Sequence, residues 1–564
     1  MGRSTRTFLW LMAAAALPHL ARAQAAPADL IVTAQHIYTV DPNRPVVQAF
    51  AVRDGRIAFA GSAREALALK GPSTRVLDLG NRTVIPGITD AHLHLLGVGT
   101  ALRTVTLTGT RSYDEVIRRV VARAREMKSG DWIRGRGWNQ NDWPDTRFPT
   151  HDALSRAVSD NPVVLTRVDG HATLANARAM EAAGITAATP DPAGGRIVRN
   201  ADGSPTGVFV DNAQGLVQRV VPPMFSREET RAAILAAIAE ASRWGLTAVH
   251  DAGESSAIID LYEELARAGR FNLRDYVMVT GDSDPTILHY LRRGPQSALY
   301  GGHLWIRAVK LYADGAMGSR GAALLEDYSD DPGNRGLLVT DSMVIRAEAV
   351  SALRHGFQLC IHAIGDHANR MVLDAYEAAL DSVPTADHRF RIEHAQVLHH
   401  QDLPRFAALG VIPAMQASHQ TSDMYWAINR LGWSRAQGAY AWRSLLNTGA
   451  IIPYGTDAPV EPVNPMRGFH AAVTRQDADG WPAGGWFPAE RMTREEALES
   501  MTIWPAYAGF MEGVAGSLSP GKYADFVVLD QDIMTVAPER ILETQVVMTV
   551  LGGQVVYQRN GDQQ

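Results

Sequence analysis

The sequence predicts an α/β protein: a (β/α)8 TIM-like barrel, a segment inserted after the first barrel strand, and a small β-sandwich domain built from both termini. Three observations support this fold class. Short apolar runs alternate with helical patterns through the middle of the chain, as expected of βα units around a parallel sheet. Both ends are instead rich in short strands separated by turns. A long stretch interrupts the alternation after the first barrel strand.

The middle of the chain contains the eight candidate strands that a closed barrel needs. We expect them at 83–92, 246–253, 273–280, 304–314, 357–366, 390–396, 411–418 and 450–459. About 150 residues separate the first two strands, which is far more than one crossover helix requires. We therefore expect an insertion at roughly 100–225 within the barrel.

The domain organisation follows from this pattern. We expect the two parts of the β-sandwich at 24–85 and 515–564, and the barrel at 86–514. Residues 1–23 predict a signal peptide, because a basic start precedes an apolar stretch and Ala21-x-Ala23 offers a cleavage site. The mature chain should begin near Gln24 and be exported, either to the periplasm or as a secreted protein.

The composition narrows the range of partners. The formal net charge of the 564 residues is −6 and no long basic run is present, which argues against nucleic acid and against a membrane surface as partner. After residue 23 no segment is apolar enough for a membrane anchor. Cys360 is the one cysteine, so no intrachain disulfide can form, and we expect it to be a buried small hydrophobe. A small molecule is the expected partner; the oligomeric state is left open.

Histidines recur at the ends of the predicted barrel strands. His92 and His94 are two residues apart on an extended strand and can therefore converge on one point. Taken alone, the pair is more simply explained as two exposed strand histidines. The other strand ends change this interpretation, because active sites of such barrels lie at the carboxyl ends of the strands. A metal centre is therefore predicted from His92, His94, Lys310, His362, His394 and Asp457.

Several motifs resemble those of one family. The stretches "PGITDAHLHL", "KLYADGAMGSR", "IHAIGDHA", "RIEHAQ" and "GTDAPV" occur in the order typical of the metal-dependent amidohydrolase superfamily. Within it the chain is similar to the YtcJ-like branch, which includes N-substituted formamide deformylases. The resemblance covers nearly all of the chain beyond the signal peptide. It specifies a reaction class and not a substrate.

The resemblance implies a binuclear metal centre. His92, His94 and Asp457 would hold one divalent metal, and His362 and His394 the second. Lys310, carrying a carbamate made from CO2, would bridge them. The alternatives for Lys310 are a strand lysine in a salt bridge or an unmodified lysine beside a single metal. Two Zn²⁺ ions per chain are expected, although the same ligands suit manganese, iron or nickel.

The expected function is that of an exported hydrolase that cleaves a non-peptide carbon–nitrogen bond in a small amide- or formamide-like molecule. A metal-activated water would be the nucleophile. Asp457 would act as base and then as acid, although it could also serve only as a ligand. One alternative is hydrolysis of an ester, a lactone or a cyclic amide at the same site. The other is a non-catalytic secreted regulatory or binding protein on this scaffold, against which the complete ligand set argues.

Three further residues are weaker candidates for substrate contacts. His171 lies in the insertion, which could cap the barrel mouth, and His419 follows the seventh strand. Arg320 follows the fourth strand and could bind an anionic group. The alternatives are a structural hydrogen bond for His171 and a brace within its own loop for Arg320.

Overall fold

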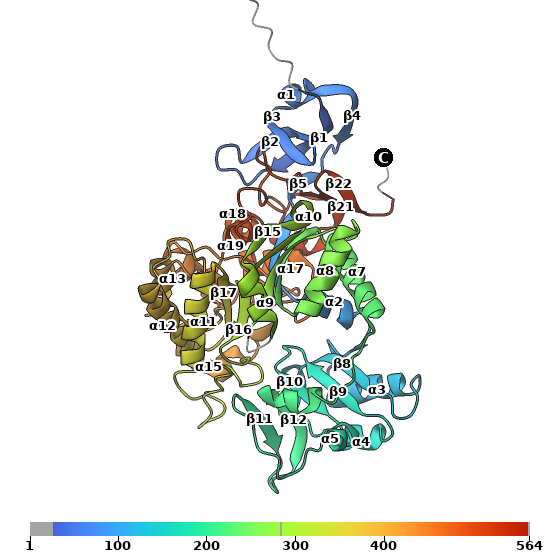
Figure 1. The fold of residues 1–564 in the computed structure, drawn as a ribbon, viewed down its shortest axis with the longest axis vertical. Coiled ribbons are helices and arrows are strands. Elements are labelled where there is room, and N and C mark those ends of the chain that lie inside the picture. Colours follow the sequence, from blue (N-terminus) through green and yellow to red (C-terminus); the bar gives the residue numbers. More distant parts are fainter. Residues whose placement is uncertain (1–25, 282–284, 562–564) are drawn as a thin grey trace, which may run out of the picture.

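Three sheets organise the chain in the computed structural model, which describes residues 26–281 and 285–561 (Figure 1). The predicted signal peptide at 1–23 lies outside the described residues. Among the helices of the described part, none combines the length and the apolar character that crossing a membrane requires.

The central sheet is a nearly closed barrel of parallel strands, which confirms the predicted α/β barrel. Its strands are almost entirely buried on both faces, as expected of parallel strands covered by helices. In their order around the barrel they are β6 (Ile88–Leu93), β13 (Leu246–Glu254), β14 (Arg274–Thr280), β16 (Leu304–Tyr312), β17 (Gln358–Ala363), β18 (Arg391–His394) and β19 (Ile412–Ala414). The short β15 (Gln296–Ala298) pairs antiparallel with β16.

The predicted eighth strand closes the barrel without forming a regular strand. Its residues 450–457 exchange backbone hydrogen bonds with β6 on one side and with the end of β19 on the other. Regular pairing is interrupted because Pro453 has no N–H to donate. The closing backbone pairs are Ala91 with Tyr454, His92 with Asp457, Met415 with Pro453 and Met415 with Gly455.

The predicted first strand at 83–92 is in fact two strands that belong to different sheets. β5 (Thr83–Pro86) pairs with the terminal sheet, whereas β6 belongs to the barrel. Gly87 is the junction, and a Cβ atom there would lie 2.1 Å from the Thr247 hydroxyl. Only glycine therefore lets the chain pass between the sheets at this close approach.

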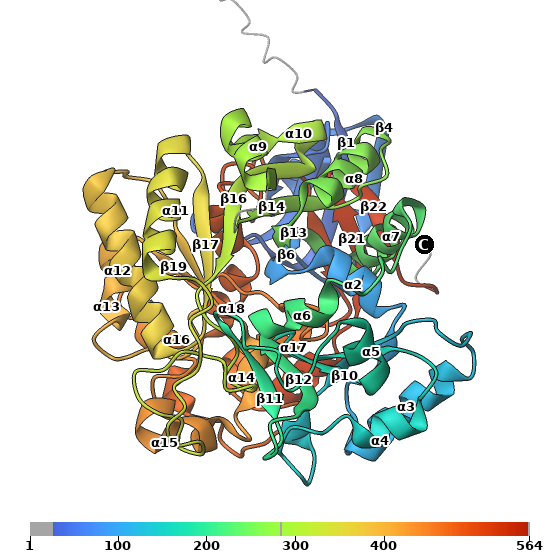
Figure 2. The same ribbon diagram turned by 60° about the horizontal axis from the view of Figure 1, so that its bottom comes forward.

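Helices surround the barrel (Figure 2). α7 begins with a capping box in which Ser226 and Glu229 satisfy each other's backbone N–H groups. The helices of the barrel are α2 (Leu95–Ala101), α7 (Arg227–Arg243), α8 (Ser256–Arg267), α9 (Pro285–Arg293), α10 (Leu299–Gly302), α11 (Ser342–His355), α12 (Asp366–Ser382), α13 (Leu403–Leu409), α14 (Ala417–Asp423), α15 (Ala427–Ala436), α16 (Trp442–Leu446), α17 (Pro465–Thr474), α18 (Arg494–Ser500) and α19 (Ile503–Ala508).

The chain between α2 and α7, where the insertion is predicted, builds a separate six-stranded sheet. It lies at one end of the barrel, coloured cyan to green in Figure 1. Its strands, in spatial order, are β11 (Gly195–Arg199), β12 (Pro205–Asp211), β10 (Ala172–Ala175), β9 (Val163–Arg167), β8 (Ile133–Trp138) and β7 (Val105–Thr106). Its helices are α3 (Tyr113–Ala124), α4 (Asp152–Ala157), α5 (Ala177–Ala182) and α6 (Gly215–Gln218).

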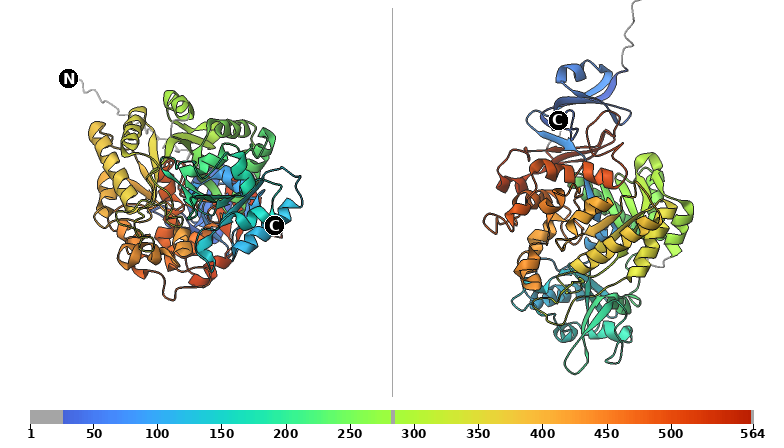
Figure 3. Two further views of the ribbon diagram at one scale, coloured as in Figure 1. Left: turned by 90° about the horizontal axis from the view of Figure 1, so that it is seen from below. Right: turned by 90° about the vertical axis from the view of Figure 1, so that its left-hand side faces the viewer.

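Strands from both ends of the chain share the third sheet, which lies at the opposite end of the molecule from the insertion (Figure 3, right). β5 pairs with both β1 and β20, and so joins the two chain ends. The order is β22 (Gln554–Gln558), β21 (Val546–Leu551), β20 (Phe526–Leu529), β5, β1 (Ala28–Tyr38), β2 (Val46–Arg53) and β3 (Arg56–Gly61), with β4 (Lys70–Asp78) beside β1 and α1 (Ala63–Leu67) following β3. A β-sandwich domain with the boundaries given above stays a prediction.

A buried ion pair links this sheet to the barrel. The Arg274 guanidinium at the start of β14 donates from Nε and Nη2 to the two Asp525 oxygens at 2.6 and 2.8 Å. The side chains of the pair are only 3% and 9% exposed. Arg274 also stacks on the ring of Tyr523 at 3.6 Å. Removing either side chain would leave the other as a buried charge without a partner, which is strongly destabilising.

Replacing Arg274 with methionine should therefore lower the free energy of unfolding by about 3–5 kcal/mol, because Asp525 then stays buried without its partner. Denaturant unfolding measures this loss. The double variant Arg274→Met/Asp525→Leu should recover much of it, whereas Arg293→Met, which removes a partly exposed pair with Glu263, should cost less than about 1 kcal/mol. A loss of that small size in Arg274→Met itself would show that the pair does not hold the sheets together.

Candidate active site

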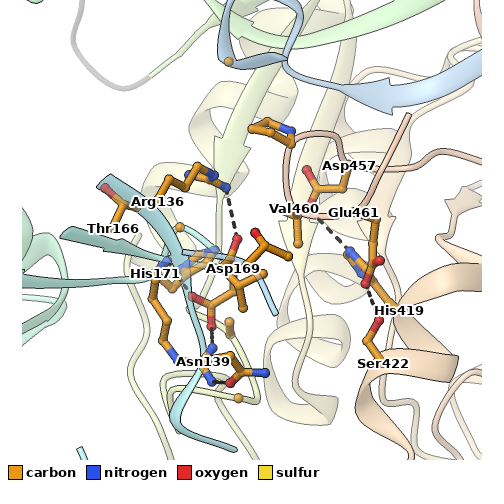
Figure 4. A pocket seen from close by; sticks show the side chains of 18 of the residues that line it. Arg136, Asn139, Thr166, Asp169, His171, His419, Ser422, Asp457, Val460 and Glu461 are labelled. Carbon is orange, nitrogen blue, oxygen red and sulfur yellow. Dashed lines mark hydrogen bonds and ion pairs between the residues drawn. The ribbon is translucent and has the colours of Figure 1, made fainter. Parts of the chain in front are cut away.

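A cavity of about 1370 Å³ lies between the carboxyl ends of the barrel strands and the sheet of the insertion. Residues of both units line it, so the insertion forms its roof and the barrel its floor. Figure 4 shows roof residues such as Arg136 and His171 facing floor residues such as Asp457 and His419. Each of the six predicted metal ligands lines this cavity.

His92 and His94 present the same ring atom to the cavity. The Nδ1 of His92 is hydrogen-bonded to Glu393, and the Nδ1 of His94 donates to the Ala252 carbonyl at 2.9 Å. Because a neutral imidazole carries one N–H, both Nε2 atoms are left as acceptors. His92 is almost fully buried, and burial together with the charge of Lys310 lowers its pKa to about 4. It is therefore neutral at physiological pH and available as a ligand.

Asp457 completes a cluster of acceptor atoms. Its Oδ1 lies 3.2 Å from Nε2 of His94 and 3.7 Å from Nε2 of His92. Burial raises the pKa of Asp457, but the adjacent imidazole rings of His94 and His92 outweigh burial and hold the pKa well below its usual range. One ligand atom from each of the three residues lies within 4.8 Å of the others. The lone pairs of the two Nε2 atoms and of the ionised carboxylate oxygen repel one another unless a cation lies among them, so this donor set fits a divalent metal.

His394 and His362 lie beside the cluster and differ from each other. The Nδ1 of His394 is hydrogen-bonded to the Gln416 side-chain oxygen at 2.7 Å, so its Nε2 is again left for the cavity. His394 forms a second potential metal group with His419 and Asp457. The Nε2 of His362 instead approaches the Gly315 carbonyl at 3.4 Å. His362 belongs to neither of the metal groups found among the described residues, although its ring centroid is 4.5 Å from that of His394.

Lys310 lies in the floor of the cavity. Its Nζ is 3.3 Å from Nε2 of His92 and 4.9 Å from the centre of the Tyr312 ring. The side chain is buried, and burial is the main reason that its pKa is lowered. The structure therefore brings Lys310 next to the predicted ligands, with its amine shifted towards the neutral form.

The residues that support His92 are fully buried. Glu393 receives hydrogen bonds from His92 on one side and from Arg391 Nη2, at 2.9 Å, on the other. Burial raises the pKa of Glu393, but the charge of Arg391 and the hydrogen bond from His92 outweigh burial and lower the pKa. Arg391 also bonds to His250 Nδ1 at 2.8 Å. The sequence analysis missed Arg391 and Glu393, although both lie on the strand "RIEH" that carries His394.

A sequence model described as the Amidohydrolase family matches residues 75–557. The chain belongs to this family. The putative amidohydrolase YtcJ of Bacillus subtilis (strain 168) is 34% identical to this chain over 531 residues. The alignment covers 93% of this chain and 98% of YtcJ. The N-substituted formamide deformylase of Arthrobacter pascens is 29% identical over 548 residues, covering 94% and 99%. The resemblance drawn from the motifs is thereby confirmed.

The fold of the amidohydrolase also matches a solved structure. The crystal structure of a metal-dependent hydrolase from Pyrococcus horikoshii OT3 aligns with a TM-score of 0.72 and 27% sequence identity, covering 90% of this chain and 99% of that one. Together with the family match, this supports a hydrolase of carbon–nitrogen bonds, as the sequence analysis expects.

The three weaker candidates for substrate contacts occupy different positions. His171 lines the cavity, and its Nδ1 is hydrogen-bonded to Asp211 at 2.8 Å. His419 also lines it, with Nε2 3.8 Å from Asp457 Oδ2. Arg320 is not among the lining residues; it pairs with Asp330 at 3.0 Å. The structure thus shows Arg320 bracing its own loop, the second of the two expected roles, and a substrate contact by Arg320 stays a prediction.

Glu393→Gln should weaken metal binding by about 10–100-fold, because the hydrogen bond that orients His92 loses its charged acceptor. Chelator competition measures the affinity, and a melting curve shows whether the fold is retained. Glu512→Gln is a matched control, since Glu512 pairs with Arg389 away from the cavity. An unchanged affinity in folded Glu393→Gln would show that Glu393 does not position the ligand.

Proposed function

We propose that this amidohydrolase is a metal-dependent enzyme that hydrolyses a non-peptide carbon–nitrogen bond in a small amide- or formamide-like substrate. The observation that carries the proposal is the convergence of His92, His94 and the ionised Asp457 on one point of the cavity. A formamide-like substrate is favoured because the deformylase of Arthrobacter pascens aligns over nearly its whole length.

The residues fit a divalent cation, most simply zinc, held by His92, His94 and Asp457. When bound there, the metal would lower the pKa of a water molecule and polarise the substrate carbonyl. A second ion would be held by His362 and His394. The bond between Arg391 and Glu393 would keep the ligand geometry fixed while substrate binds.

Asp457 is the proposed proton carrier. Its Oδ1 faces the two ligand histidines, and its Oδ2 faces His419 across 3.8 Å. One oxygen can therefore serve as a ligand while the other accepts the proton of the attacking water. The same oxygen would then return that proton to the leaving nitrogen. His419, whose Nε2 has no hydrogen-bond partner among the described residues, is placed to contact the substrate at this point.

Lys310 is proposed to carry a carbamate. The neutral amine forms a bond from Nζ to the carbon of CO2 and releases one proton to water, which leaves a carboxylate on Nζ. This anion could contact both metal positions, because Nζ lies beside His92 in the floor of the cavity. A free ammonium would instead place a positive charge next to the metals, so the modification removes a repulsion and adds a ligand.

Lys310→Ala should lower the metal content from about two ions per chain towards one and remove most of the activity, because the two-metal site loses its bridge. Lys310→Arg should behave in the same way, since a guanidinium stays protonated and cannot capture CO2. A short carboxylic acid added at high concentration should partly restore metal content and activity in Lys310→Ala. Two retained ions with near-normal turnover would contradict the carbamate.

The reaction is tested by supplying zinc- or manganese-loaded enzyme with N-formyl and N-acyl amines beside matched esters and lactones. Release of formate or another acid from the amides is the expected result. Asp457→Asn should lower kcat by at least about 1000-fold, because it removes both a ligand charge and the proton carrier. Turnover of only the esters or lactones, or full activity of Asp457→Asn, would overturn the proposal.

Export is part of the same proposal and rests on the sequence of residues 1–23. The amino terminus of the protein purified from its native host should lie near Gln24. Recovery of the chain with Met1 in the cytoplasm would contradict export without affecting the proposed reaction.

A further inference from the structure

The roof of the cavity presents arginines on one strand. Arg134 and Arg136 are two residues apart on β8 and share the side that faces the cavity. Their partners on β9, Val164 and Thr166, line the cavity as well. The roof above the barrel mouth is therefore a sheet surface with cationic side chains on it.

A bulge in β8 separates this surface from the core of the insertion. Gly137 has a φ of +105°, and a Cβ atom there would lie 2.2 Å from the Thr108 hydroxyl. The register shifts at this point, so Trp138 turns away from the cavity. It is fully buried, and its indole N–H donates to the Leu165 carbonyl at 2.8 Å. The local sequence "RGW" therefore places Arg136 in the cavity and Trp138 in the core.

Arg136 has spare hydrogen-bonding capacity. Its Nη2 donates to the Val168 carbonyl at 3.1 Å, whereas its Nε is buried and has no partner among the described residues. No carboxylate in the described part of the chain forms an ion pair with it, in contrast to the neighbouring Arg167, which pairs with Asp169. The backbone of Gly170 packs against the guanidinium, because a Cβ atom built there would lie at van der Waals contact, 3.7 Å from both Nη atoms. Arg136 itself lines the cavity, so a ligand in the cavity can reach it.

The roof carboxylates nearby are already bound to other groups. Asp169 is held by Arg167, and Asp211 accepts from His171 at 2.8 Å. Burial lowers the pKa of Arg136, and the charges of Asp457 and Asp169 counteract this. A guanidinium keeps its proton under these conditions. Arg136 is a partly buried cation that lines the cavity and has no carboxylate partner among the described residues, and such a group is stabilised by an anion.

We propose that Arg136 binds a carboxylate of the substrate, and that the substrate class is amides with a free carboxylate, such as N-acyl or N-formyl amino acids. A planar guanidinium offers donors that match both oxygens of a carboxylate. Figure 4 places Arg136 on the opposite side of the cavity from Asp457, so one molecule would meet both ends of the site. The inference rests on the proposed function, since it specifies the substrate of the same cavity.

The experiment compares N-formylphenylalanine with its methyl ester, following release of formate from both. In Arg136→Gln the KM for the free acid should rise by about 10–100-fold, the effect of losing charge-assisted hydrogen bonds, while kcat changes little. The KM for the methyl ester should change by less than about threefold. Arg136→Lys should lie between wild type and Arg136→Gln for the acid, because lysine keeps the charge but loses the fork.

Arg118→Gln is the matched control, because Arg118 is an exposed arginine on α3 of the same insertion and does not line the cavity. It should leave both substrates unchanged. Equal losses for acid and ester in Arg136→Gln would mean that Arg136 only braces the roof through Val168, and would overturn the inference. A wild-type preference for the ester would do the same.

A binding measurement separates this inference from the proposed reaction. Calorimetry in the Asp457→Asn background reports binding of N-formylphenylalanine without turnover. Binding that Arg136→Gln abolishes supports the carboxylate site, even if the wild-type enzyme releases no formate from either compound and the proposed reaction fails. No binding of the acid, or equal binding with and without Arg136, overturns the site independently of any activity.

Discussion

One of the backbone hydrogen bonds that close the barrel also brings the candidate site together. The amide of Asp457 donates to the carbonyl of His92 at 2.6 Å, which joins the last segment of the barrel to the first strand. The same contact brings the Asp457 carboxylate to the two ligand histidines. Asp457 adopts a left-handed backbone conformation with φ near 56°, a costly arrangement for a residue other than glycine. The closing segment therefore completes the sheet and also supplies the Asp457 side chain to the cavity.

The floor of the site is rigid because its charges are buried in a connected network. His250, Arg391, Glu393 and His92 follow one another through hydrogen bonds on fully buried strands. Arg391 and Glu393 form a buried ion pair at its centre, so removal of either one leaves the other as a buried charge without its partner. The network also fixes which nitrogen of His92 faces the cavity. A metal held there would meet a ligand whose orientation is set before binding.

The roof is made from a different part of the chain than the floor. The barrel strands supply the potential ligands, whereas the insertion supplies Arg136 and His171 from a sheet of its own. A change in the roof can therefore alter which molecule is accepted without moving the floor. The roof residues come from strands and from tight turns such as the one at Gly170, so they too are held in place by backbone pairing. Function in this fold is set by the site and not by the barrel alone.

The sequence by itself determined the barrel strands and the residues of the candidate site, because parallel strands have a clear apolar pattern and their carboxyl ends share one rim. It placed His92, His94, Lys310, His362, His394 and Asp457 at that rim, where they line one cavity. Only the tertiary structure decided which groups meet. It showed that Glu393 supports His92, that Arg320 is taken up by Asp330, that Gly87 divides one predicted strand between two sheets, and that Arg136 faces the barrel. Some of these contacts join residues that are far apart in the chain, and others depend on a β-bulge that reverses the side of the sheet on which a side chain lies. The spacing of residues along the chain predicts neither.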